Sequence, residues 1–311
     1  MTATGAVLIP IGPGTREVER TADLLDALWS HESTITEVVL VDDAPGPPTR
    51  MRNLLAAVAP PTGCRVTVVP NPRNGRGSGL WGGLCAGVLA GLRFIQSDTD
   101  AAFTVKLDTD ALVIGPFASA IRREFAEHPD VAVVGSYDRR CDGTPRDFAP
   151  SAPTTRELTR LIRVKMRPPS RGRYVQQTLW GDGARVRRRI QEAVAQGMSF
   201  GEHCQGGAYA VSRALLARMR DAGCFDEWRG WLHTAAGEDA MIAVYARALG
   251  MSLRGMVDAG QPFAVFHQGL AGTCTWLADS GYALIHSVKN DARATEAEIR
   301  AFFKARRVRA P

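Results

Sequence analysis

Three features are missing from this 311-residue sequence, and each absence excludes a class of protein. The six cysteines contain no Cys-X-X-Cys pair, which argues against a zinc site and against a disulfide framework. The first residues lack a basic region followed by an apolar core, so we expect no signal peptide. The longest apolar stretch, residues 80–95, is interrupted by four glycines and by Arg93, and a membrane span needs roughly 20 apolar residues. We therefore expect a cytoplasmic protein without an integral membrane segment.

Positive charge is concentrated in one part of the chain. The net charge is +6, but residues 156–190 hold eleven basic residues and two acidic ones, a local net charge of +9. Such a run favours anionic partners, either an acceptor or a phosphate group, or it is simply a solvated helical face with a loop. Binding of single-stranded nucleic acid would require interleaved aromatic residues, and only Tyr174 and Trp180 are present. We expect no nucleic-acid partner.

Apolar segments typical of strands alternate with helical patterns through the first half of the chain. The predicted strands are residues 6–11, 37–43, 65–69 and 103–107, and the predicted helices are residues 16–30, 49–58 and 84–94. This alternation predicts an α/β fold with a Rossmann-like, mostly parallel central sheet and helices on both faces. In such sheets, ligands bind outside the carboxyl ends of the strands.

The strand at residues 103–107 ends abruptly in Asp108-Thr109-Asp110. Side chains alternate along a strand, so Asp108 and Asp110 leave its end on the same side. Two converging carboxylates suit Mg²⁺ or Mn²⁺, which keep open positions for phosphate oxygens. The alternative is a polar strand end or a helix cap. Asp42 and Asp43, after the strand at residues 37–43, fall at the same edge of the sheet and favour the metal site.

Several motifs together resemble the A-type (GT-A) glycosyltransferase fold, and within it the family 2 glycosyltransferases. They occur in the order expected for that family and span residues 6–270: Val7-Leu8-Ile9-Pro10, Val39-Leu40-Val41-Asp42-Asp43, Asn71-Pro72-Arg73-Asn74-Gly75-Arg76-Gly77, Asp108-Thr109-Asp110, Gly206-Gly207-Ala208-Tyr209, Gly237-Glu238-Asp239 and Phe266-His267. The resemblance implies a nucleotide-sugar-binding half at residues 1–115 and an elaborated acceptor-binding and catalytic half at residues 116–270. Residues 271–311 would be a C-terminal extension.

The resemblance also implies roles for particular residues. The donor would contact Pro10, Gly12, Asp42, Asp43, Asn74, Arg76 and Asp108. The metal ion, Mn²⁺ or Mg²⁺, would be held by Asp110, with Asp108 on the ion or on the ribose. His267 would be a late metal ligand, and His286 competes with it for that role.

Transfer to a hydroxyl group also requires a general base opposite the leaving group. Asp239, beside Glu238 at the start of a predicted helix over residues 240–249, suits this role and would give inversion at the sugar carbon. The alternative is that both acids only cap the helix, because anionic side chains are favoured at helix N-termini.

We therefore expect a glycosyltransferase that takes a sugar, most simply from a uridine diphosphate sugar, to a small-molecule, saccharide or peptide acceptor. Two alternatives remain open. Gly12-Pro13-Gly14-Thr15-Arg16 resembles the glycine-rich loop of sugar nucleotidyltransferases, although no lysine follows it between Glu17 and Ser30. A protein that binds a nucleotide sugar or an anion without catalysis is the other alternative.

Overall fold

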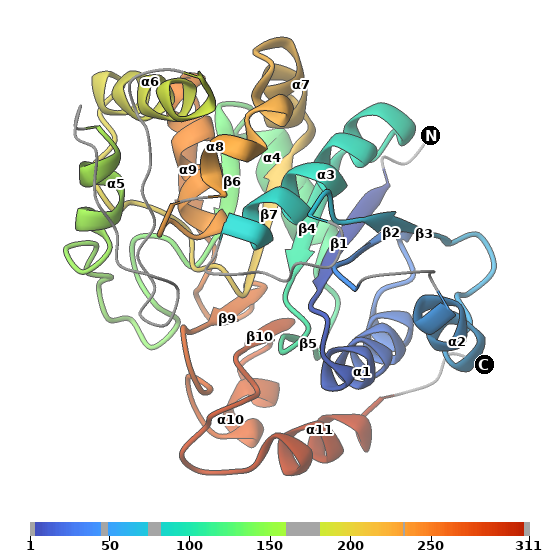
Figure 1. Cartoon of the computed structure of the whole chain (residues 1–311). Coiled ribbons are helices and arrows are strands. Elements are labelled where there is room, and N and C mark those ends of the chain that lie inside the picture. The colour runs from blue at the N-terminus through green and yellow to red at the C-terminus, as the bar shows by residue number, and fades with distance from the viewer. Residues whose placement is uncertain (1–3, 45–48, 74–81, 160–180, 233, 308–311) are drawn as a thin grey trace.

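A seven-stranded sheet forms the centre of the computed structural model, which describes residues 4–44, 49–73, 82–159, 181–232 and 234–307 (Figure 1). The strand order is β3-β2-β1-β4-β7-β6-β8. Only β7 runs antiparallel to its neighbours, β4 and β6. The predicted α/β fold with a mostly parallel sheet is thus confirmed. The strands are β1 (Gly5–Ile11), β2 (Ile35–Asp42), β3 (Arg65–Pro70), β4 (Phe103–Leu107), β6 (Val131–Gly135), β7 (Ala208–Ser212) and β8 (Ser252–Gly255).

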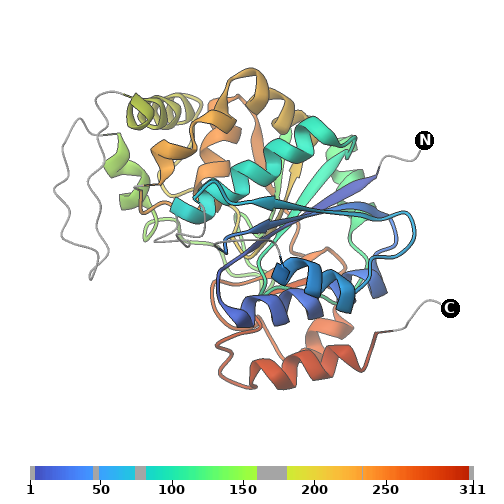
Figure 2. The same cartoon turned by 45° about the vertical axis from the view of Figure 1, so that its right-hand side comes forward.

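Helices cover both faces of this sheet (Figure 2). One face shares a core cluster with α1 (Thr15–His31), α2 (Thr49–Ala57), α4 (Ala118–Glu127), α10 (Cys274–Asp279) and α11 (Glu296–Lys304). The other packs on α3 (Gly82–Asp98), α5 (Ala152–Leu158), α6 (Gly181–Ala195), α7 (Arg213–Asp221), α8 (Trp228–Trp231) and α9 (Glu238–Ala248), with a short 3₁₀ turn, η2, at Cys224–Asp226.

Strand β1 shows why the central strands are apolar on both sides. Val7 and Ile9 belong to one core cluster, whereas Ala6 and Leu8 belong to the other. Because successive side chains point to opposite faces, a parallel strand covered by helices on both faces is a nearly continuous apolar run.

Glycines let α3 approach the sheet closely. A Cβ atom on Gly91 would lie 2.3 Å from Cδ1 of Leu8, and one on Gly82 would lie 2.3 Å from the carbonyl oxygen of Leu232. The glycines that interrupt the apolar stretch at residues 80–95 therefore permit close helix packing.

A second sheet brings the end of the chain to the centre. Its strand order is β5-β10-β9, with β5 at Leu112–Val113, β9 at Phe263–Val265 and β10 at Leu284–His286. Strand β10 is antiparallel to β5 and parallel to β9. Because β5 follows the Asp-Thr-Asp segment almost directly, residues beyond 271 lie beside that segment. The domain boundaries at residues 115 and 270 stay a prediction.

Candidate active site

Asp108 and Asp110 lie at the carboxyl end of β4, in the middle of the central sheet. The amide N–H of Asp108 donates to the carbonyl of Gly207, and the amide of Ala111 donates to the carbonyl of Asp108 in a tight turn. Asp110 is buried, whereas the side chain of Asp108 is about a quarter exposed. The turn therefore keeps both carboxylates at the edge where ligands of parallel sheets bind.

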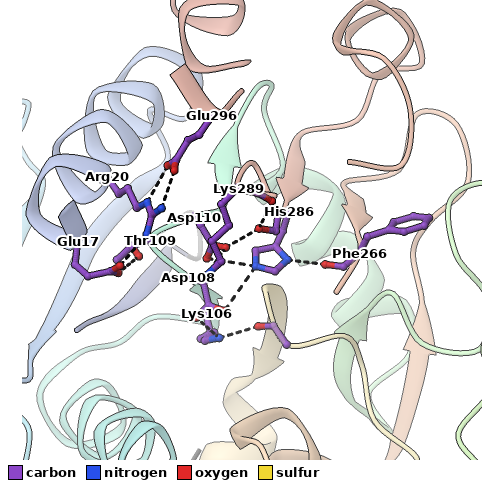
Figure 3. A network of polar contacts seen from close by, with 12 residues as sticks. Glu17, Arg20, Lys106, Asp108, Thr109, Asp110, Phe266, His286, Lys289 and Glu296 are labelled. Carbon is purple, nitrogen blue, oxygen red and sulfur yellow. Dashed lines mark hydrogen bonds and ion pairs between the residues drawn. The ribbon is translucent and has the colours of Figure 1, made fainter. Parts of the chain in front are cut away.

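His286, at the end of β10, completes a group of three candidate metal ligands with Asp108 and Asp110 (Figure 3). Their ligand atoms all lie within 4.8 Å of one another. Nε2 of His286 is 3.4 Å from Oδ1 of Asp110 and 3.9 Å from Oδ2 of Asp108. Nδ1 lies 2.7 Å from the carbonyl oxygen of Phe266 and donates to it, which leaves Nε2 free to face the carboxylates. Two carboxylates and one oriented imidazole fit a divalent ion.

Of the two histidines expected to compete as the late metal ligand, the structure places His286, and not His267, beside Asp108 and Asp110. His267 is exposed and lies outside the group of three. Strands β9 and β10 are parallel, and His286 is in register with Val265, so His267 falls two residues beyond the end of β9. The middle strand β10, rather than the edge strand β9, contacts β5 and the metal site.

His286 and Asp110 stabilise each other's charged forms in the metal-free site. Burial alone would lower the pKa of His286, but the hydrogen bond and the charge of Asp110 outweigh it and raise this pKa. Burial alone would raise the pKa of Asp110, but the hydrogen bond from His286 dominates and lowers it well below its ordinary value. A divalent ion would take over this role of the imidazolium.

The segment after β10 wraps around Asp110, and the sequence analysis did not identify its role. The hydroxyl of Ser287 donates to Oδ2 of Asp110 at 2.7 Å, and Nζ of Lys289 lies 2.9 Å from the same oxygen. The amide of Val288 donates to the carbonyl of Asp110. No local pattern signals these contacts, since they join residues about 180 positions apart.

Lys106 is a buried cation beneath the site. Its Nζ lies 2.6 Å from Oδ1 of Asp108, 2.6 Å from Oε1 of Glu238 and 2.7 Å from the carbonyl oxygen of Gly206. Burial raises the pKa of Glu238 to about 7, although the Lys106 charge opposes this shift. Glu238 is therefore enclosed and paired, and Asp239 is the more accessible acid of the predicted pair.

Gly206 and Gly207 lie between the candidate metal ligand His286 and the acids of α9. A Cβ atom on Gly206 would lie 2.8 Å from Oδ2 of Asp239, and one on Gly207 would lie 2.0 Å from Cγ of His286. Two adjacent residues without side chains thus bring Asp239 and the metal ligands to opposite sides of one backbone segment.

Asp239 lies in the first turn of helix α9, close to a histidine and an arginine. Its Oδ1 accepts from the amide of Ala240, and its Oδ2 lies 3.5 Å from Nε2 of His203. Nη2 of Arg146 is 3.0 Å from the same His203 nitrogen, and Nδ1 of His203 is 2.7 Å from the carbonyl oxygen of Gly201. The N-cap of α9 is Gly237 and has no side-chain cap bond, so the contact of Asp239 with the helix is the bond from the amide of Ala240.

A pocket lies at the carboxyl ends of β1, β2 and β3. Pro10, Gly12, Asp43 and Asn71 are among its lining residues. Burial raises the pKa of Asp43 to about 6, although Arg73 opposes the shift. Within the described ranges, Oδ1 of Asp43 is buried and has no hydrogen-bond partner. A pocket with an unpartnered carboxylate oxygen suits a ligand that donates an N–H group.

Asp42, Asn74 and Arg76 were also predicted to contact the donor. Asp42 does not line the pocket; it pairs with Arg50 and accepts from the amide of Ala44. Asn74 and Arg76 lie outside the described residues, as does most of the Arg-rich segment, residues 160–180.

Helix α11 holds the middle residue of the Asp-Thr-Asp turn from behind. Nη2 of Arg300 donates to the carbonyl of Thr109, and the hydroxyl of Thr109 donates to Glu17 of α1. Arg20 joins Glu17 to Glu296 of α11 (Figure 3). Helix α11, which belongs to the predicted C-terminal extension at residues 271–311, therefore stabilises the Asp-Thr-Asp turn.

No family model and no curated protein matches this chain. The chain is similar to the solved mannosyltransferase Ktr4p from S. cerevisiae, with 10% identity over 82% of this chain and 68% of that chain, at a TM-score of 0.44. Core-mannan synthase A (CmsA/Ktr4) from Aspergillus fumigatus, in its Mn/GDP form, gives 12% identity over 84% and 72% of the two chains, at a TM-score of 0.43. The bifunctional glycosyltransferase WbbM gives 12% identity over 97% and 52%, at a TM-score of 0.48.

No helix in the described ranges is long and apolar enough to cross a membrane. These similarities have sequence identities of 10–12% and TM-scores below 0.5, so the function has to be inferred from the geometry of the site itself. Along the carboxyl edge of the sheet, the site consists of the pocket at β1–β3, the three candidate metal ligands at β4 and β10, and Asp239 beside the start of β7.

Proposed function

We propose that this chain is a metal-dependent glycosyltransferase, which moves a sugar from a nucleotide diphosphate sugar to a hydroxyl group of an acceptor. One observation carries the proposal: a pocket, three candidate metal ligands and an accessible acid follow one another along one edge of the sheet. This order matches the order of groups in the reaction, which are the nucleoside, the diphosphate, the sugar and the acceptor hydroxyl.

Asp110, Asp108 and His286 would hold Mn²⁺ or Mg²⁺, which when bound supplies a Lewis acid for the departing diphosphate. Asp110 is the direct ligand in this proposal, because its carboxylate is the more deeply buried and the better oriented. Asp108, which is more exposed, reaches the ion or the ribose of the donor.

Asp239 is the general base of the proposed reaction. It removes the proton from the acceptor hydroxyl as the bond between the sugar and the diphosphate breaks, and the electron pair of that bond leaves with the diphosphate. Attack from the side opposite the diphosphate inverts the sugar carbon. Glu238 acts as a positioning residue, because it is enclosed and paired with Lys106.

The pocket that contains Asp43 would receive the base of the nucleotide. We propose a uridine diphosphate sugar, since the unpartnered oxygen of Asp43 can accept the N–H of uracil. The acceptor would be a small molecule, a saccharide or a peptide.

Calorimetric and thermal-shift titrations test the donor site. Uridine, guanosine and thymidine diphosphates are each added with and without Mn²⁺ to the wild type, to Asp110→Ala and to a control, Asp100→Ala, which changes an exposed acid elsewhere. A diphosphate at about 100 times its Kd adds about 2.7 kcal/mol of stability. We expect one diphosphate to bind only with Mn²⁺, and we expect Asp110→Ala alone to abolish this binding.

Other outcomes would contradict the proposed glycosyl transfer. Binding of a nucleoside triphosphate but of no diphosphate would favour nucleotidyl transfer, and binding of no nucleotide would refute the donor site. Asp239→Asn should retain diphosphate binding and lose transfer once a donor is known. Equal transfer by this variant would exclude Asp239 as the base.

A further inference from the structure

Two of the four lysines in the chain contact the carboxylates of the candidate metal site, and they differ in how deeply their side chains are buried. Lys106 is fully buried and is held by three oxygen atoms. The side chain of Lys289 is 43% exposed, and among the described residues Asp110 is its one ion-pair partner. A lysine ammonium on a flexible four-carbon stem can change partners at little cost. Lys289 is therefore the movable cation of the site.

Lys289 and a metal ion compete for the same carboxylate. Oδ2 of Asp110 accepts the hydroxyl of Ser287 and the ammonium of Lys289, while Oδ1 faces Nε2 of His286. A divalent ion among Asp108, Asp110 and His286 would lie close to this ammonium and would repel it. Since the side chain is exposed, the ammonium can leave Asp110 without losing a buried environment.

We propose that Lys289 exchanges partners during binding: it neutralises Asp110 while the metal site is empty and turns to the diphosphate of the donor once the metal has taken Asp110. This inference rests on the proposed function, because that function supplies the diphosphate. A diphosphate held by the metal would offer several anionic oxygens near Asp110. In the free protein the ammonium of Lys289 repels the metal ion and lowers its affinity. Once the donor is bound, the same ammonium attracts the diphosphate.

The exchange couples the two ligands. The metal frees Lys289 for the diphosphate, and the diphosphate removes Lys289 from competition with the metal. Such coupling is reciprocal, so each ligand must raise the affinity of the other by the same factor. Without Lys289, metal binding should become stronger while diphosphate binding becomes weaker.

Calorimetric titration of Lys289→Met tests both signs. Mn²⁺ alone should bind this variant several-fold more tightly than the wild type. Uridine diphosphate at saturating Mn²⁺ should bind about tenfold or more weakly, as expected for a lost hydrogen bond to a charged group. Lys289→Arg should keep most of the diphosphate affinity. Lys304→Met, which changes an exposed lysine in the last turn of α11, is the matched control and should behave as the wild type.

Each result has a distinct meaning. If Mn²⁺ binds Lys289→Met no more tightly than the wild type, Lys289 does not compete with the metal and the inference fails. If diphosphate affinity is unchanged, the second half of the exchange fails. If the wild type binds Mn²⁺ but none of the nucleoside diphosphates, the proposed function fails, and the Mn²⁺ titration still decides whether Lys289 competes.

Discussion

Gly207→Ala should displace a metal ligand without changing any chemical group of the site. The added Cβ would lie 2.0 Å from Cγ of His286 and 2.1 Å from Nδ1, and ordinary contacts begin at 3.4 Å. The ring must therefore retreat by about 1.4 Å, the difference between these distances, whereas metal–ligand distances tolerate only about 0.2 Å. The variant should lose His286 as a ligand.

The size of the effect follows from packing and from coordination. Overpacking of a buried position costs about 1–3 kcal/mol of the free energy of unfolding. Even the loss of a group that orients a metal ligand lowers metal affinity by about 10–100-fold, so loss of the ligand itself should cost at least as much. We expect Mn²⁺ affinity in Gly207→Ala to match that of His286→Ala.

Four variants examined by Mn²⁺ calorimetry and urea unfolding provide the test: Gly207→Ala, His286→Ala, the double variant and a control. In the double variant Gly207→Ala/His286→Ala, Mn²⁺ affinity should be no lower than in His286→Ala, because the ligand is already lost. Gly14→Ala is the control, since its Cβ would meet only Cγ of Glu17 at 3.9 Å. Wild-type Mn²⁺ affinity in Gly207→Ala would refute this account of the site, and so would additive losses in the double variant.

Three further predictions concern buried carboxyl groups. Burial raises the pKa of Asp43 to about 6, so its neutral form stabilises the fold below about pH 4. This contribution to stability disappears as the pH rises through 6. A difference in Tm between the wild type and Asp43→Asn that stays constant from pH 3.5 to 7 would contradict this prediction. Lys106→Met leaves Asp108 and Glu238 without their cation and should cost about 3–5 kcal/mol in urea unfolding; the double variant with Glu238→Gln should recover part of the loss, and no recovery would count against the pair. Glu32→Gln weakens two hydrogen bonds from the amides that begin α4 and should cost about 1–3 kcal/mol while diphosphate binding in titrations stays unchanged.

Local sequence patterns predicted the strands β1 to β4 and the acids at the ends of β2 and β4. The apolar run at residues 103–107 and the following Asp108 and Asp110 are adjacent in the chain, so their relative placement depends on strand geometry alone. The parallel pairing of strands β1 to β4 likewise follows from alternation with helices, whereas their order in the sheet, β3-β2-β1-β4, was not predicted.

The choice between His267 and His286 depends on contacts that no local pattern encodes. His267 lies two residues beyond β9 and His286 is the last residue of β10, and the two short apolar strands are parallel neighbours. Only the pairing of β10 with β5 places His286 beside Asp110. That pairing joins residues about 170 positions apart.

Lys106 carried a signal that could have been used. A lysine within the buried strand Phe103–Leu107 must have anionic partners, because unpaired buried charges are very costly. Its position on the same side of the strand as Asp108 could be predicted from the sequence, because the two residues are two apart, but Glu238 as its second partner depends on how α9 packs.

The pairing of β5 with β10 also affects the order in which the protein can mature during synthesis. Asp108 and Asp110 leave the ribosome about 180 residues before His286 and Lys289. At about 5–20 residues per second, this interval lasts roughly 10–35 s. During this time β4 can pair with β1 and later with β7, whose residues Ala208–Ser212 are made within the interval, but β10 does not yet exist. The pocket at the carboxyl ends of β1, β2 and β3 can therefore form early, whereas the three candidate metal ligands cannot come together until β10 has been made.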